Sequence, residues 1–159
     1  MTEEELRAKL DALEKGPAKI ATAVSGLSSK TLRYKPAPDK WCILEILAHL
    51  ADVEIIYGYR LRQILADKNP QIGPIDQDDW ANNLAYMETS APESVAQHAL
   101  LRRSNLRLLR RIKPADLQRS AFHPELNGPF RLADLLERMV KHDPNHLEQI
   151  ERLKKQAGK

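Results

Sequence analysis

The chain has 159 residues, of which 42% are hydrophobic and 5% aromatic, and its formal net charge is +3. This length is sufficient for one substantial core, so we expect a single domain over residues 1–159, and the shortage of aromatic residues favours packed helices over a sheet. The single cysteine excludes an intramolecular disulfide, no apolar run is long enough for a membrane span, and the acidic N-terminus is unlike a signal peptide, so we expect a cytoplasmic protein.

The first predicted helix covers about residues 3–24. Thr2 and Glu5 have the spacing of a capping box, and leucines then recur at helical intervals. Gly16-Pro17 lies inside this segment and should kink or interrupt the helix, because proline lacks the N–H that a helix interior uses. The following segment, residues 25–40, contains serines and prolines and is predicted to be a long irregular connection.

Three further long helices are predicted from the same periodicity. Their expected ranges are about 41–67, 91–112 and 131–155. Between them, residues 76–90 could open a short helix, and residues 121–129 are predicted to be a loop because they contain two prolines and a glycine. The sequence therefore predicts an all-α four-helix bundle with short additional helices in the connections.

Three histidines lie on the apolar faces of two of these helices. His49 lies on the inner face of the second long helix, and His142 and His146, four residues apart, lie on one side of the last. One histidine in such a place is usually a neutral core residue with a single hydrogen bond. Three together are different, because each unsatisfied imidazole would cost roughly 1–3 kcal/mol and a divalent cation would relieve that cost. This pattern predicts a three-histidine metal site with open coordination positions, which is the catalytic arrangement.

Polar residues close to the three histidines could accept the remaining ring N–H groups and orient the rings. The candidates are Glu45, Asp52, Asp143 and Gln149. The three carboxylates could equally be exposed charges, whereas an inward-facing Gln149 needs hydrogen-bond partners. Imidazole suits several metals, so zinc or nickel is expected, with iron or manganese as alternatives.

The remaining histidines and the cysteine are interpreted as parts of the scaffold. His123 lies among prolines and glycine and is predicted to be solvated or to belong to a turn. His98 lies with Asn105 on the inner face of the third long helix, which indicates a partly polar interior or a pocket wall rather than a ligand. Cys42 is interpreted as a small core residue rather than a ligand or nucleophile.

Two sequence motifs resemble those of a known family. The run WCILEILAHLADVE, residues 41–54, is similar to the signature of the DinB superfamily, a tryptophan and a glutamate that lead into His-Leu-x-Asp-x-Glu. The run HDPNHLEQI, residues 142–150, is similar to that family's second motif, His-Asp-x-x-His-x-x-Gln-Ile. The resemblance implies a four-helix bundle in which His49, His142 and His146 hold a metal. Family members are often dimers, and some are metal-dependent transferases that use a thiol such as bacillithiol or mycothiol.

The residues and the resemblance together favour a metal-dependent enzyme that acts on a small molecule, and the resemblance implies a homodimer. A thiol-dependent S-transferase with a low-molecular-weight thiol as cosubstrate is the first expectation. The alternatives are metal-assisted hydrolysis and a non-catalytic metal- or small-ligand-binding bundle. Pro144, between the two histidines of the second motif, should bend the last helix and could change the angle between them.

The third long helix also carries a group of arginines on its outer side, at positions 103, 107, 110 and 111. Nucleic-acid binding through this helix is one interpretation, and a solvated outer face is the other. We favour the second, because no stacking aromatic residues and no groove-reading motif accompany the arginines. No nucleic-acid partner is expected.

Overall fold

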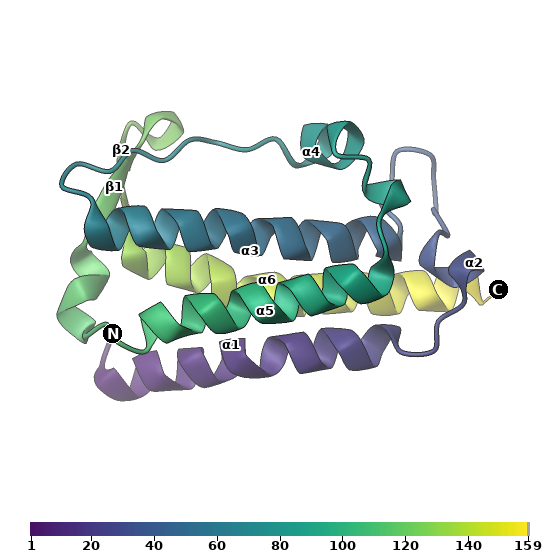
Figure 1. Cartoon of the computed structure of the whole chain (residues 1–159), viewed down its shortest axis with the longest axis horizontal. Coiled ribbons are helices and arrows are strands. Elements are labelled where there is room, and N and C mark those ends of the chain that lie inside the picture. Colours follow the sequence, from purple (N-terminus) through teal and green to yellow (C-terminus); the bar gives the residue numbers. More distant parts are fainter. Residues whose placement is uncertain (159) are drawn as a thin grey trace.

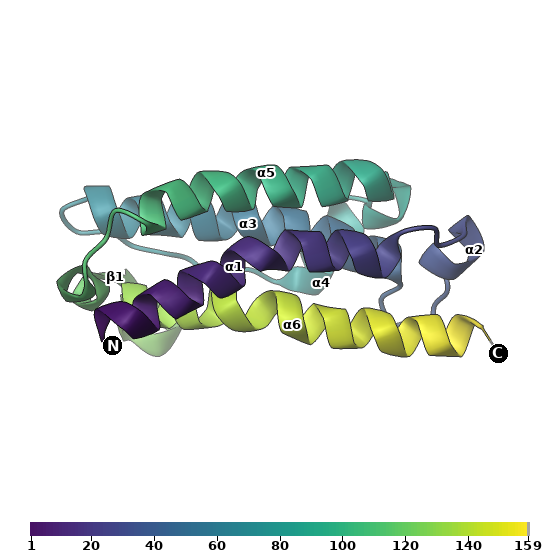
Figure 2. The ribbon, with the colours of Figure 1, turned by 90° about the horizontal axis from the view of Figure 1, so that it is seen from below.

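Four long helices lie side by side along the longest axis of the molecule (Figure 1; Figure 2). The computed structural model describes residues 1–158. The long helices are α1 (Glu3–Val24), α3 (Ile43–Ala66), α5 (Ala91–Leu109) and α6 (Leu132–Ala157). In Figure 1, α3 and α5 run in one direction and α1 and α6 run in the other. The prediction of an all-α four-helix bundle is confirmed.

Short elements occupy the connections, as predicted. They are the helices α2 (Ser29–Leu32) and α4 (Gln77–Asn83), the single 3₁₀ turns η1 (Tyr86–Glu88), η2 (Pro114–Gln118) and η3 (Pro124–Leu126), and the strands β1 (Ser120–His123) and β2 (Gly128–Arg131). Within the described residues, no helix combines the length and the apolarity that crossing a membrane requires.

The helix ends follow local capping chemistry. The backbone N–H of Glu5 donates to the Thr2 hydroxyl (3.1 Å), and the N–H of Thr2 donates to the Glu5 carboxylate (2.7 Å), so the predicted capping box is present. The N–H of Cys42 donates to the Glu45 carboxylate (2.8 Å), so α3 begins at Ile43, slightly later than predicted. α5 ends at Leu109 rather than at residue 112, ahead of the turn that leads into η2.

Residues 121–129 belong to a β-hairpin, so the prediction of a loop was wrong there. Strands β1 and β2 pair antiparallel, and Ala121 lies opposite Phe130. The segment after α3 adds to the same edge, because Phe122 donates its N–H to the carbonyl of Pro70 (2.9 Å) and accepts from the N–H of Ile72 (3.0 Å). Proline and glycine indicated the turn, but the bridge between Gln71 and Phe122 joins residues about fifty positions apart and is not visible in the local sequence.

The interior contains two apolar clusters with a polar layer between them. One cluster fills the end of the bundle that carries the hairpin, and its members on α3 and α6 include Tyr57, Leu61, Leu135 and Met139. The other fills the opposite end, with Ile46, Leu50, Ile150 and Leu153 on the same two helices. All four long helices contribute polar residues or a glycine to the layer between these two clusters: Gly16, His49, Glu54, His98, Arg102, Asn105, His142, Asp143 and His146.

Candidate metal centre

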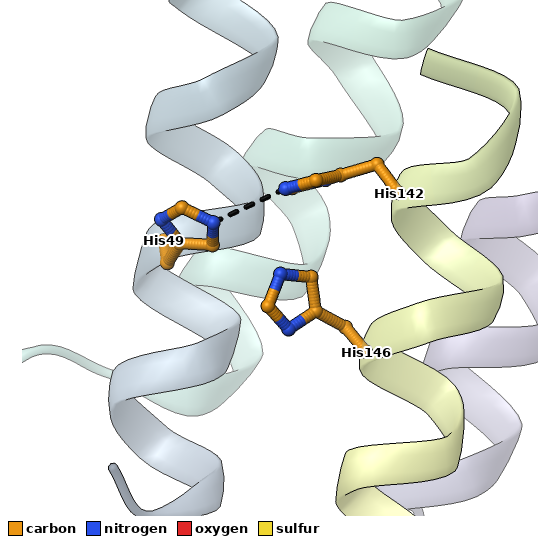
Figure 3. Close-up of side chains that lie close together, drawn as sticks. All are labelled: His49, His142 and His146. Carbon is orange, nitrogen blue, oxygen red and sulfur yellow. Dashed lines mark hydrogen bonds between the residues drawn. The ribbon is translucent and has the colours of Figure 1, made fainter. Parts of the chain in front are cut away.

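Helices α3 and α6 bring three histidines together in this polar layer (Figure 3). The centroids of the His49 and His142 rings are 5.1 Å apart, those of His49 and His146 4.9 Å, and those of His142 and His146 4.6 Å. One nitrogen from each ring lies within 4.8 Å of the other two. The structure therefore converges the three predicted residues on one point. Pro144 lies inside α6, which runs without interruption from Leu132 to Ala157 and carries both histidines.

The donor set fits a divalent cation. Zinc binds imidazole nitrogen at about 2.0–2.1 Å in tetrahedral geometry, which puts two such nitrogens about 3.3 Å apart. The Nε2 atoms of His49 and His142 are 3.1 Å apart, close to that separation. The nitrogen of His146 is within 4.8 Å of both, a distance that a modest rotation of its side chain can reduce. Three ligands leave coordination positions free for water or substrate.

Burial keeps the three rings neutral at physiological pH. It lowers the pKa of His49 to about 3, and the neighbouring His146 ring contributes. Burial, followed by the His146 and His49 rings, lowers the pKa of His142 to about 2. Burial also lowers the pKa of His146, although a hydrogen bond to Gln149 opposes this. A neutral imidazole has a free lone pair, so all three rings are in the form that binds metal.

Of the four polar residues predicted to orient these rings, Gln149 is the one that bonds a ring of the histidine cluster. Its Oε1 atom is 3.1 Å from Nδ1 of His146. Since an amide oxygen accepts hydrogen bonds, this contact places the ring proton on Nδ1 and leaves the Nε2 lone pair free.

The other three candidates bond elsewhere. Glu45 accepts from the N–H of Cys42 and from Nζ of Lys35 (2.7 Å) and therefore caps α3. Asp52 accepts from the hydroxyl of Tyr86 (2.7 Å). Asp143 bonds Arg102. Sequence proximity indicated these residues, but the direction in which each side chain leaves its helix determined its partner.

Aromatic rings confine the histidine cluster. Trp41 meets the His49 ring edge-on with centroids 4.9 Å apart, and its indole N–H donates to Asp78 (3.1 Å), which anchors it to α4. Tyr57 lies 5.6 Å from the His142 ring, also edge-on. These contacts restrict the rotation of two of the three histidines.

A cavity of about 690 Å³ opens beside the histidines, between α3, α6, the hairpin and the segment that leads into α4. His123 lines it and is 7% exposed, so it is not a solvated histidine; the alternative prediction of a turn residue agrees with its position directly before η3. Strand β1 ends at His123 and turns its side chain inward, and Nδ1 is buried without a hydrogen-bond partner among the described residues. Alternation of buried and exposed residues along this strand was the signal that could have indicated its burial.

A second buried polar cluster lies behind the histidines, and sequence reasoning missed its central residue, Arg102. The guanidinium is 1% exposed and donates to Glu54 (2.8 Å) and to both oxygens of Asp143 (2.9 Å each). His98 lies 3.4 Å from Asp143, and Asn105 donates to Glu54 (3.0 Å). The predicted partly polar interior is thus present, and the spacing of residues 98, 102 and 105 on one helical face was the available signal.

Helix α1 contributes to this cluster through Gly16-Pro17. Because Pro17 has no N–H, the carbonyl of Leu13 lacks its usual helical partner, and it accepts from Arg102 instead (3.0 Å). A Cβ atom at Gly16 would collide with the Asp143 carboxylate. The pair does not interrupt α1, which runs unbroken from Glu3 to Val24. It lets the helix approach the arginine and provides an acceptor for it.

The charged groups of the arginine cluster stabilise one another's charged forms. Burial alone would raise the pKa of Asp143, but bonds to His98 and Arg102 lower it well below its ordinary value. Burial likewise disfavours the charged form of Arg102, but Glu54 and Asp143 outweigh burial and raise its pKa overall. Since Asp143 follows His142 in the chain, the cluster also holds the turn of α6 that carries a predicted ligand.

Comparisons with known proteins agree with this architecture. The model of the family described as the DinB superfamily matches residues 12–150. A Bacillus mycoides protein named "Putative metal-dependent hydrolase BcerKBAB4_2443" is 26% identical over 158 residues, 99% of this chain and 90% of its own length. "Putative metal-dependent hydrolase YfiT" of Bacillus subtilis is 27% identical over 152 residues, 94% of this chain and 84% of its own.

The solved structure of YfiT superposes with a TM-score of 0.91 at 24% identity and covers 99% of this chain and 90% of that one. It is described as having "an unusual four-helix bundle topology". This likeness shows a shared fold.

Proposed function

The chain belongs to the DinB superfamily, and from that premise we propose that it is a metal-dependent hydrolase whose His49, His142 and His146 hold one divalent cation. The observation that carries the proposal is the convergence of three neutral imidazoles, with one nitrogen of each within 4.8 Å of the others, beside an open cavity. The names of the relatives support hydrolysis. Zinc or nickel suits these ligands best, and iron or manganese would be accepted.

The bound cation would supply Lewis acidity, which lowers the pKa of a coordinated water or thiol and so provides an anionic nucleophile at neutral pH. The chain's own residues prepare that site. Gln149 sets the tautomer of His146, and Trp41 and Tyr57 limit the rotation of the other two rings. The cavity admits a small molecule to the open side of the cluster.

A thiol-dependent S-transferase is the second candidate, with a low-molecular-weight thiol as cosubstrate. The cavity of about 690 Å³ has room for a small thiol beside an electrophile. The chain's only thiol, on Cys42, is fully buried, lies 3.4 Å from the sulfur of Met87, and has a pKa that burial raises. A thiol nucleophile would therefore come from a second substrate and not from the protein.

Metal analysis of purified protein tests the ligand set. We expect about one ion per chain in the wild type after reloading and desalting, and at least a tenfold loss in His49→Ala and in His142→Ala. His123→Ala is the matched control, because His123 lines the same cavity and lies outside the cluster; it should retain the ion. Equal metal content in all four proteins, whether high or negligible, would contradict the proposed ligands.

Activity assays separate the candidate reactions. The zinc- and nickel-loaded proteins would be given ester, amide and phosphoester substrates in one series, and small thiols with an electrophile in another. Turnover in the first series that His142→Ala abolishes supports a hydrolase, and turnover only in the second supports a transferase. Tight metal binding without turnover in either series would favour a non-catalytic binding module.

We also propose that the protein works in the cytoplasm and forms a homodimer. The family resemblance implies the dimer. Light scattering coupled to gel filtration would measure a mass close to twice 18.1 kDa if the dimer forms. A mass of one chain across the micromolar concentration range would contradict it.

A further inference from the structure

The positively charged side chains of α3 and α6 that line the cavity lie beyond the histidines, toward the hairpin. On α3, the side chains that line it run from His49 through Tyr57 to Arg60, and on α6 they run backward from His142 through Lys141 to Arg138. Because α3 and α6 run in opposite directions (Figure 1), Arg60 and Arg138 lie at the same end of the cavity. Arg138 is one helical turn, about 6 Å, from His142 along the axis.

Both guanidiniums are held in place by uncharged groups. Arg60 donates to the backbone carbonyl of Gly73 (2.6 Å). Arg138 stacks on the ring of Phe130, with its central carbon 5.1 Å from the ring centroid. Over residues 1–158, neither arginine forms an ion pair with a carboxylate, and Lys141 forms none either. Two fixed positive charges therefore face the cavity without compensation.

The phenol of Tyr57 adds a further donor at this end. The two carboxylates that line the cavity do not neutralise the arginines. Asp76 accepts from the backbone N–H groups of Asp78 and Asp79 and caps α4, and Glu125 lies in the turn of the hairpin.

We propose that this end of the cavity is a binding subsite for an anionic group of the substrate, a carboxylate or a phosphate, held between Arg60 and Arg138. This inference rests on the proposed function, because it assigns the far end of a substrate whose reacting group lies at the histidines. Donors that converge without an acceptor match an anion, and a guanidinium offers paired N–H groups to either oxyanion. The substrate class that follows is a small molecule with a negative group roughly one to two helical turns from the bond that reacts.

Anion binding can be measured directly by calorimetry. Succinate and inorganic phosphate would each be titrated into zinc-loaded and into metal-free wild-type protein in low-salt Tris chloride. We expect saturable binding of at least one of them to both forms, weakened about tenfold or more in Arg60→Gln/Arg138→Gln. Preference for succinate would identify a carboxylate subsite, and preference for phosphate a phosphate subsite.

The matched control is Arg103→Gln/Arg107→Gln, which removes the same charge from the exposed side of α5, outside the cavity. It should bind both anions as the wild type does. Lys141→Gln, a single change at the same cavity, should weaken binding by a smaller factor. Equal weakening in both double variants, or no saturable binding to the wild type, would overturn the subsite. Since the metal-free protein is one arm of the experiment, the subsite can fail while the metal centre stands, and the reverse also holds.

Discussion

Two buried polar clusters lie in the same layer of the bundle, and they differ in whether their members satisfy one another. Around Arg102, one cation meets the carboxylates of Glu54 and Asp143 within 2.9 Å. Around His49, three like rings meet, and burial lowers the pKa of each, so that each is neutral and has a lone pair. The charges of the first cluster are paired within the chain, although Nδ1 of His98 and Nε of Arg102 have no hydrogen-bond partner among the described residues. The second has the donor set of a binding site.

The comparison shows how burial can serve two different purposes. A buried charge costs several kcal/mol unless it is paired and hydrogen-bonded, and the arginine cluster supplies both conditions. The histidine cluster avoids the cost of charge by keeping its rings neutral, and burial itself ensures this by lowering their pKa values. Four measurements can test this difference between the arginine cluster and the histidine cluster.

Removal of the central cation should have the largest effect. Arg102→Met leaves Glu54 and Asp143 buried without their partner, so we expect the free energy of unfolding to fall by about 3–5 kcal/mol. Urea denaturation of wild type and variant measures this directly. The neighbouring, exposed Arg103→Met should change stability by less than about 0.5 kcal/mol. A loss below 1 kcal/mol for Arg102→Met would mean that the arginine cluster does not stabilise the fold in this way.

Zinc binding at the histidine cluster should have the second-largest effect on the free energy of unfolding. Zinc at about one hundred times its dissociation constant should raise the free energy of unfolding by about 2.7 kcal/mol, because it binds the folded state alone. Thermal unfolding with and without zinc would show the shift, and His142→Ala should lose it. An equal shift in the variant would place the ion elsewhere.

Gly16→Ala tests the contact between the two clusters and α1. The new methyl group would collide with the Asp143 carboxylate, and we expect a loss of about 1–3 kcal/mol from the resulting displacement. Gly73→Ala is the control, since a Cβ there meets nothing within 4 Å and should be nearly neutral. Similar stabilities for the two alanine variants would show that α1 can move aside freely.

The last prediction concerns the dependence of stability on pH. The pKa of His142 falls from 6.5 to about 2 on folding, so between these values the unfolded chain binds a proton that the folded chain does not. The contribution of this residue is fully present above pH 6.5 and is lost as the pH falls below it, by up to about 1.4 kcal/mol per pH unit. His142→Leu should flatten the fall in stability of the metal-free protein between pH 6 and pH 4. An unchanged slope would mean that the ring is protonated in the folded state.

Much of the architecture and the composition of the candidate site followed from local patterns. The capping box at Thr2, the helical spacing of His142 and His146, and the apolar face around His49 are properties of single helices. They depend on residues a few positions apart, where the backbone geometry is known in advance. The two motifs then identified the family, and the family model confirms that identification.

The residues that were misjudged share one property. His123 was expected to be solvated or in a turn and is buried where the hairpin turn begins. Residues 121–129 were expected to form a loop and form a hairpin, and Gly16-Pro17 was expected to kink or interrupt a helix that continues. In each case a distant segment supplies what the local sequence lacks. The strand edge at residues 70–72 pairs with β1, and Arg102 from α5 bonds the carbonyl that Pro17 leaves free.

The sequence by itself determined which residues are helical, which faces are apolar, and which three histidines have the chemistry of ligands. Only the tertiary structure decided which polar groups became partners: Asp143 with Arg102, Gln149 with His146, and Arg60 and Arg138 with no carboxylate among residues 1–158. The physical reason is that partnership depends on the axial offset and rotation of helices that are distant along the chain. A shift of one residue, about 1.5 Å and 100° of rotation, changes which side chains meet.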